Sequence, residues 1–145
     1  MKKVILAFIM FFIMTSASLA DSNVYITQSG AALDLDITMD GNGNAVGASN
    51  DRTLLTGANL DVDIDLIGAT NTITGDFIGA GESGSDDLKI SQTGSTNTTA
   101  LNVGAPAATD DVKILETRVG SSGATTYTIG NAATVQDVSV TVDVV

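Results

Sequence analysis

Aspartate is the residue type best placed to do chemistry in this chain, because it recurs in one register of a repeated phrase. The phrase reads Asp-φ-x-φ-x-φ, where φ is usually apolar, and its copies start roughly 26 residues apart. Stacked copies would place their carboxylates in a column about 4.8 Å apart, which predicts a Ca²⁺ site because Ca²⁺ takes oxygen ligands. The alternative is that the aspartates are solvated turn residues. The column consists of Asp34, Asp61, Asp87, Asp111 and Asp137.

Residues for most other kinds of site chemistry are missing. The chain has no His and no Cys, so it cannot form a Ser/His/Asp or Cys/His arrangement or a Cys/His metal site. We therefore predict that the protein is not an enzyme and has no cofactor other than Ca²⁺. A second Ca²⁺ candidate is Asp40-Gly41-Asn42-Gly43-Asn44, which is like the first half of an EF-hand loop, although an ordinary Asn/Gly turn is the better explanation.

The spacing of glycine and asparagine supports the same repeat. Gly41, Gly68, Gly94 and Gly120 share the period of the phrase, and an asparagine follows each of the first three glycines by three residues. A fixed period of this length is typical of repeat architectures, and period-2 alternation indicates strands. We predict an all-β fold, a small β-solenoid of about four to five stacked strand-turn-strand rungs. The alternative is a β-sandwich, which gives no reason for a shared Asp register.

Stacking of the copies predicts which residues share a column. We expect an amide ladder of Asn44, Asn71 and Asn97, and glycine turns with positive φ. Near residue 116 the apolar pattern arrives two residues early, and we expect a bulge to absorb this slip. The two inward columns are Leu35, Val62, Leu88, Val112 and Val138, and Ile37, Ile64, Ile90, Ile114 and Val140.

Residues 1–20 have the features of a secretory signal peptide, so we expect residues 21–145 to form one exported domain. A lysine pair opens the chain, an apolar stretch follows, and Ser18-Leu19-Ala20 resembles a cleavage site. The apolar stretch is too short to span a bilayer, which disfavours an uncleaved anchor. We expect the protein to be secreted, either extracellular or on the surface of a bacterial cell.

Charge narrows the choice of partners. Without residues 1–20 the chain keeps four basic and all 17 acidic residues, and 4 − 17 gives a net charge of −13. Phosphate backbones would be repelled, so we expect no nucleic-acid partner. No segment after residue 20 is apolar enough to insert into a membrane.

The segment from Leu88 to Leu101 resembles the repeat of curlins, the subunits of bacterial curli amyloid fibres. Gln92, Gly94 and Asn97 match the middle of that repeat, and Ser22, Gln28 and Gly30 match its first half. Other copies depart from it, with Met39 and Leu66 where Gln is expected, and the closing Gln is absent throughout. The Gly/Asn-rich secretion segment expected after the signal is also missing.

This resemblance implies an exported structural subunit that polymerises into a cross-β fibre or matrix for adhesion and biofilm. Its partners would be further copies of itself, together with secretion or nucleation proteins of a curli-like system. The residues add that the C-terminal segment has strong strand-forming character and no proline, so we expect a self-association edge there. The alternative is a monomeric secreted β-solenoid or β-sandwich that serves as a binding module or adhesin, with or without Ca²⁺. The predicted edge consists of Val138, Val140, Val142 and Val144.

Overall fold

The protein is a β-solenoid built of two facing parallel sheets. The computed structural model describes residues 21–30, 32–47, 53–79, 86–104, 111–130 and 136–145, so the predicted signal peptide at 1–20 lies outside the described residues. The described residues form no helix, and thus none long and apolar enough to cross a membrane. The strands are β1 (Ser22–Val24), β2 (Thr27–Ser29), β3 (Asp34–Asp40), β4 (Gly43–Val46), β5 (Thr53–Gly57), β6 (Asp61–Ile67), β7 (Thr70–Gly79), β8 (Asp86–Thr93), β9 (Thr96–Val103), β10 (Val112–Val119), β11 (Ser122–Ile129) and β12 (Ser139–Val144).

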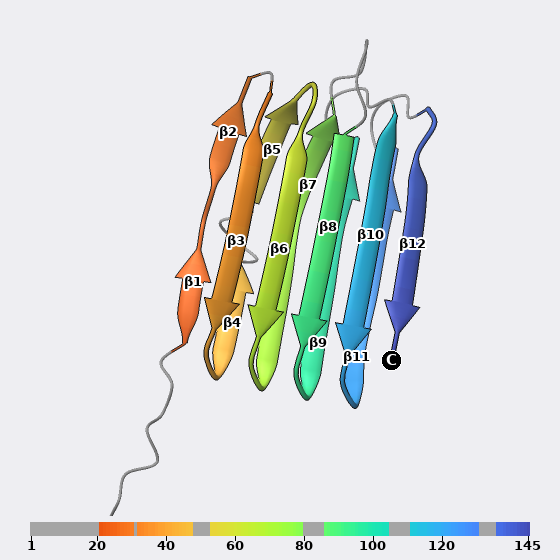
Figure 1. Ribbon diagram of the computed structural model, residues 1–145. Helices are drawn as coiled ribbons and strands as arrows, with labels where there is room; N and C mark the ends of the chain where they lie inside the picture. Colours follow the sequence, from red (N-terminus) through yellow and green to blue (C-terminus); the bar gives the residue numbers. More distant parts are fainter. Residues whose placement is uncertain (1–20, 31, 48–52, 80–85, 105–110, 131–135) are drawn as a thin grey trace, which may run out of the picture.

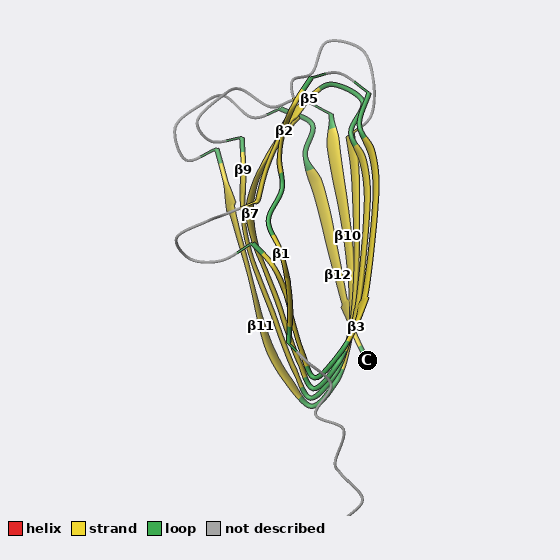
Figure 2. Cartoon of the chain, turned by 90° about the vertical axis from the view of Figure 1, so that its left-hand side faces the viewer, coloured by secondary structure: helices red, strands yellow, loops and turns green. Residues whose placement is uncertain are grey.

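Successive segments of the chain alternate between the two sheets, and each new rung is added next to the one before it. One sheet has the order β12-β10-β8-β6-β3, and the other contains β11, β9, β7 and the short strand pairs β4/β5 and β1/β2 (Figure 1). Every strand pairing among the described residues is parallel. Seen along the stack, the two layers meet at the turns that connect them and diverge toward the opposite side (Figure 2). The predicted solenoid is confirmed, and parallel pairing between successive copies rules out the sandwich.

Among the described strands, complete rungs occupy the middle of the stack, and each end carries half a rung. The complete rungs are β3 with β4/β5, β6 with β7, β8 with β9, and β10 with β11, which gives about four stacked turns. At the N-terminal end, β1 and β2 add a strand to only one sheet, by pairing with β4 and β5. At the C-terminal end, β12 adds a strand to only the other sheet, by pairing with β10.

The predicted slip near residue 116 is wrong. Ile114 pairs with Leu88 and Val140 pairs with Ile114, so one uniform register continues through β10 and β12 without a bulge. Parallel strands exchange regularly spaced backbone hydrogen bonds, which favours a constant register over a local interruption. The spacing of the recurring glycines, 26 residues from Gly94 to Gly120, matches this register.

The predicted inward columns hold through β8 and are wrong beyond it. The first column runs through Leu35, Val62 and Leu88, and continues with Ile114 and Val140 in place of Val112 and Val138. The second runs through Ile37, Ile64 and Ile90, and then meets Glu116 and Val142 in place of Ile114 and Val140. The core between the sheets also contains Leu60, Leu66, Ile73, Phe77, Leu101 and Val103.

Candidate functional site

The three repeated asparagines form a ladder inside the turns that join the two sheets. Asn44 Nδ2 donates to Asn71 Oδ1 at 3.1 Å, and Asn71 Nδ2 donates to Asn97 Oδ1 at 2.9 Å. All three side chains are at most 2% exposed. The last amide in the ladder donates to the Val119 carbonyl at 3.2 Å. The ladder therefore satisfies buried amides and joins three successive rungs at their turns.

The glycine column has a different cause from the one predicted. Positive φ occurs at other glycines, such as Gly47 and Gly104, and not at the four recurring ones. A Cβ added at Gly94 would instead overlap the Gly68 carbonyl and lie 3.0 Å from Asn71 Nδ2. The equivalent overlap occurs at Gly120, against Gly94. Glycine is required at Gly68, Gly94 and Gly120 because successive turns approach too closely for any side chain.

The predicted Asp column is only partly assembled. Asp34, Asp61 and Asp87 are in register with one another, but the next two positions of that column are Lys113 and Ser139. The two remaining aspartates of the column precede strands β10 and β12 and belong to another position.

Asp111 and Asp137 occupy a left-handed corner that recurs along the stack. Their φ angles are 50° and 46°, and Ala32 and Asn59 have φ angles of 60° and 54°. In chain order, Asn59 follows Ala32 by one period of the repeat, Asp111 follows Asn59 by two, and Asp137 follows Asp111 by one. Asp and Asn tolerate this conformation better than most residues, so Asp111 and Asp137 suit the corner.

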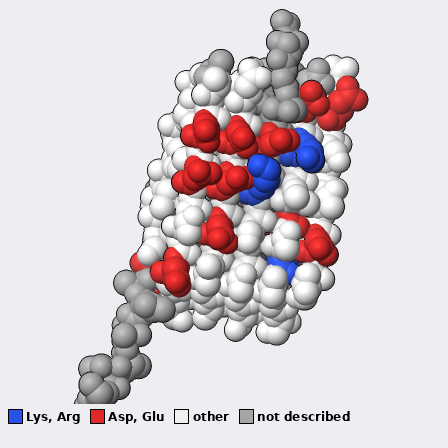
Figure 3. Space-filling view, viewed as in Figure 1, with Lys and Arg blue, Asp and Glu red and all other residues white. Residues whose placement is uncertain are grey.

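The acidic residues that do align lie on the outer face of the β3–β12 sheet. Two rows of carboxylates cross this face, and each ends in a lysine (Figure 3). Lys89 Nζ lies 3.3 Å from Asp63 Oδ1 and 3.6 Å from Asp61 Oδ1. The hydrogen bond to Asp63, with the charge of Asp61, raises the pKa of Lys89 above its ordinary value.

The placed carboxylates do not support the predicted Ca²⁺ sites. Among the described residues, no group of three or more His, Cys, Asp or Glu side chains could hold a metal ion. The EF-hand-like stretch is the connection from β3 to β4, and Asn44, its last residue, belongs to the buried ladder. The aligned rows fit a solvated face in which lysine offsets part of the repulsion.

The predicted self-association edge is the last strand of its sheet. Val140 is half-buried, whereas Val142 and Val144 are 40% and 59% exposed. Val138 is half-buried and precedes β12, which begins at Ser139. Among the described strands, β12 pairs only with β10, so one of its edges is open.

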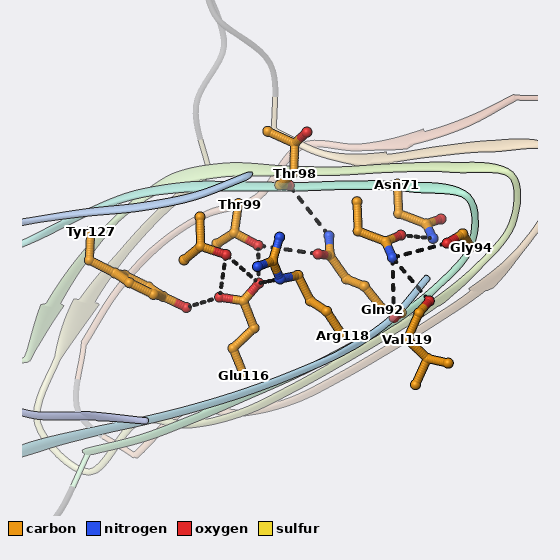
Figure 4. Close-up of polar contacts among 11 residues, drawn as sticks. Asn71, Gln92, Gly94, Thr98, Thr99, Glu116, Arg118, Val119 and Tyr127 are labelled. Atoms are coloured by element: carbon orange, nitrogen blue, oxygen red, sulfur yellow. Dashed lines mark hydrogen bonds and ion pairs between the residues drawn. The ribbon is translucent and has the colours of Figure 1, made fainter. Parts of the chain in front are cut away.

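A buried polar cluster near the C-terminal end was not predicted. Glu116 has no exposed surface and occupies the column of Ile37, Ile64 and Ile90. Its Oε1 atom accepts a hydrogen bond from Thr99 Oγ1 at 2.8 Å, and its Oε2 atom accepts one from the Tyr127 hydroxyl at 2.7 Å (Figure 4). A buried carboxylate is tolerated when such partners replace water.

Further groups complete the cluster around this carboxylate. Thr125 Oγ1 lies 3.0 Å from Oε1 and 3.2 Å from Oε2, and Arg118 Nε lies 3.5 Å from Oε1. Thr99 Oγ1 also lies 3.3 Å from the Oε1 atom of Gln92. Burial, followed by the hydrogen bond to Glu116, raises the pKa of Tyr127 far above its usual range. The cluster is a neutralised, water-poor polar site between the sheets.

Sequence reasoning missed this cluster because it aligned the repeats on aspartate. Alignment on Gly94 and Gly120 places Glu116 opposite Ile90 and Arg118 opposite Gln92, both at inward positions. Charged residues at inward positions were therefore visible in the glycine register. Comparisons with protein-family models, with curated proteins and with solved structures gave no match.

Proposed function

We propose that the protein is an exported structural subunit that associates with further copies of itself by rung-on-rung strand pairing. The product is an extracellular fibre or matrix of the curlin kind, which serves adhesion or biofilm. The observation that carries this proposal is the pair of half-rungs at the ends of the solenoid. Strands β1 and β2 extend one sheet at one end, and β12 extends the other sheet at the opposite end.

The two half-rungs complement one another. When a second copy is added at the C-terminal end, its β1 and β2 pair with β11 and lie opposite β12 of the first copy. The β3 strand of the second copy then pairs with β12. One complete rung forms from the two halves, and both sheets continue through the junction in parallel. Exposed strand edges favour such pairing because their backbone groups otherwise lack strand partners.

The side chains at this junction continue the columns of the stack. In the register set by β10 and β12, Val140 meets Leu35, Val142 meets Ile37, and Val144 meets Met39 of the next copy. The exposed valines of β12 would thus be covered by residues of the same character. Burial of apolar area is the main favourable contribution to such association.

The outward positions at the junction do not set like charges opposite one another. Ser139 meets Asp34, Thr141 meets Asp36, and Asp143 meets Thr38 of the next copy in the same register. Like charges placed directly opposite on neighbouring strands are destabilising. The outer rows of aspartate therefore do not oppose head-to-tail pairing of two copies in this register, although each copy has a large negative net charge.

The test is to concentrate the purified chain at physiological salt and follow particle size by light scattering, with fibre diffraction on the product. We expect growth into fibres with a strand repeat of about 4.8 Å along the fibre axis. Val140→Lys, or removal of residues 138–145, should prevent growth, whereas Asp65→Lys on an inner strand should not. A chain that stays monomeric for days at high concentration refutes the proposal and favours a monomeric binding module.

A further inference from the structure

The Thr99 side chain contacts two other buried side chains between the sheets, those of Gln92 and Glu116. Gln92, Thr99 and Glu116 are 1%, 1% and 0% exposed. The Thr99 hydroxyl lies 2.8 Å from Glu116 Oε1 and 3.3 Å from the carboxamide oxygen of Gln92. Figure 4 shows the threonine between the other two side chains. A nucleophile beside both a carboxylate base and a carbonyl group is the basic arrangement for acyl transfer.

We propose that Thr99 and Gln92 form an intramolecular ester, with Glu116 as the general base. Thr99 Oγ1 attacks the side-chain carbonyl carbon of Gln92, and the hydroxyl proton passes to the Glu116 carboxylate. The tetrahedral intermediate collapses as the bond from this carbon to Nε2 breaks, and Glu116 returns the proton to the leaving nitrogen. One C–O bond forms, one C–N bond breaks, and one ammonia is released without an oxidant or reductant.

Each hydrogen bond of the cluster fits its role in this step. The Thr99 hydroxyl can donate to either acceptor, and its shorter hydrogen bond, to Glu116, directs the proton to the base and leaves the oxygen beside the carboxamide group. Gln92 Nε2 donates to the Thr98 carbonyl at 3.4 Å, which anchors the leaving nitrogen. General bases act efficiently when they lie within hydrogen-bond distance of the proton that they accept.

Arg118 supplies positive charge beside the reacting carbonyl group. It pairs with Gln92 in the neighbouring strand, and its Nε lies 3.5 Å from Glu116 Oε1. Figure 4 shows the guanidinium group directed toward Glu116. A positive group in a site with little water stabilises the negative charge that develops on the carbonyl oxygen during attack.

This combination occurs once among the described rungs. At the positions equivalent to Gln92, Thr99 and Glu116, the preceding rungs have Leu66, Ile73 and Ile90. The ester would join β8 to β9 and thus the two sheets of one rung. Because the site is closed to water, the ester would be protected from hydrolysis. A covalent link between the sheets would suit a subunit that bears load, but the chemistry does not depend on polymerisation.

Intact mass spectrometry of the purified chain, aged at neutral pH, tests this assignment. We expect a mass lower than the calculated value by one ammonia, and peptide fragmentation that links residues 92 and 99. Fragmentation is required because a succinimide at Asn42-Gly43 would lose the same mass. Hydroxylamine should cleave the link, since it attacks esters.

Substitutions separate the roles of the three residues. Thr99→Val should abolish the link, whereas Thr99→Ser keeps a hydroxyl and should retain it. Glu116→Gln should slow ester formation by roughly 100-fold or more. If Thr99→Val fails to fold, Gln92→Leu serves as the variant that lacks the acyl group. A wild-type chain that keeps its calculated mass after prolonged ageing overturns the proposal, as does an ammonia loss that fragmentation places elsewhere.

Discussion

The N-terminal strands β3 to β7 and the C-terminal strands β8 to β12 share one backbone register but differ in what fills it. Inward positions in the first group carry Ile64, Leu66 and Ile73, and the equivalent positions two rungs later carry Glu116, Arg118 and Thr125. Parallel backbone pairing thus tolerates a change from an aliphatic to a polar interior. Burial of apolar side chains stabilises both regions, and the C-terminal region also depends on hydrogen bonds to its buried polar groups.

The largest effect should come from moving the polar chemistry into the aliphatic region. Ile64→Glu places a carboxylate between Ile37 and Ile90, where no hydroxyl or guanidinium partner is available among the paired positions. We expect the free energy of unfolding to fall by about 3–5 kcal/mol, the cost of an uncompensated buried charge. Denaturant melts check this value. Asp65→Glu, on the outward side of the same strand, is the matched control, and equal melts for the two variants would contradict the inward assignment.

Replacing a turn glycine should lower the stability by a similar amount in both regions, because the close contact between successive glycines occurs in both. Gly68→Ala and Gly94→Ala each direct a Cβ into the carbonyl of the preceding glycine. We expect each to lower the free energy of unfolding by about 1–3 kcal/mol, the usual cost of overpacking. Thermal or denaturant melts measure both, with the exposed Ser95→Ala as control. A loss of stability for only one of the two glycine variants would show that the turns of the two regions are not packed in the same way.

Removing one partner of Glu116 should weaken only the C-terminal region. Tyr127→Phe deletes the 2.7 Å hydrogen bond to Oε2 and should cost about 1.5–3 kcal/mol, as for other bonds to charged groups. Tyr25→Phe is the control, because Tyr25 is 53% exposed. Hydrogen exchange should show the loss in β10 and β11 and leave β3 and β6 protected. Uniform loss of protection would indicate that the stack unfolds as one unit.

Alkaline pH should act on the same hydrogen bond more weakly. The pKa of Tyr127 is raised in the folded chain, so its contribution is complete below the ordinary tyrosine pKa of about 10 and is lost as pH rises above it. We expect the wild type to lose about 1 kcal/mol more than Tyr127→Phe between pH 10 and 11. If the free energy of unfolding changes equally with pH in the two proteins, the pKa of Tyr127 is not raised by folding, which would contradict this prediction.

The sequence predicted the fold well because the repeat constrains it at several positions at once. Apolar residues, glycines and the three ladder asparagines all follow the spacing of the stack, and each needs the same neighbours above and below. The amide ladder could be inferred from this spacing alone. The reason for the glycines could not, because a close approach between turns is a property of the packed structure.

The predicted Asp column is wrong where one residue type serves two positions of the repeat. Asp87 is the second residue of strand β8, whereas Asp111 occupies a left-handed corner two residues before Lys113, the position equivalent to Asp87. Sequence letters do not distinguish these two environments. The same misalignment assigned Ile114 to the second inward column and hid Glu116, whose partners Thr99 and Tyr127 come from other strands.

The most direct test of the proposed assembly is a cross-link across the junction between two copies. The chain has no Cys, so Thr141→Cys in one copy and Asp36→Cys in another can be mixed and oxidised without competing thiols. We predict disulfide-linked heterodimers, since the proposed junction pairs these outward positions on neighbouring strands. Thr141→Cys mixed with Asp63→Cys is the control, because Asp63 lies on an inner strand whose edges are already paired. Equal cross-linking in the two mixtures, or none in assembled material, would contradict the junction of half-rungs.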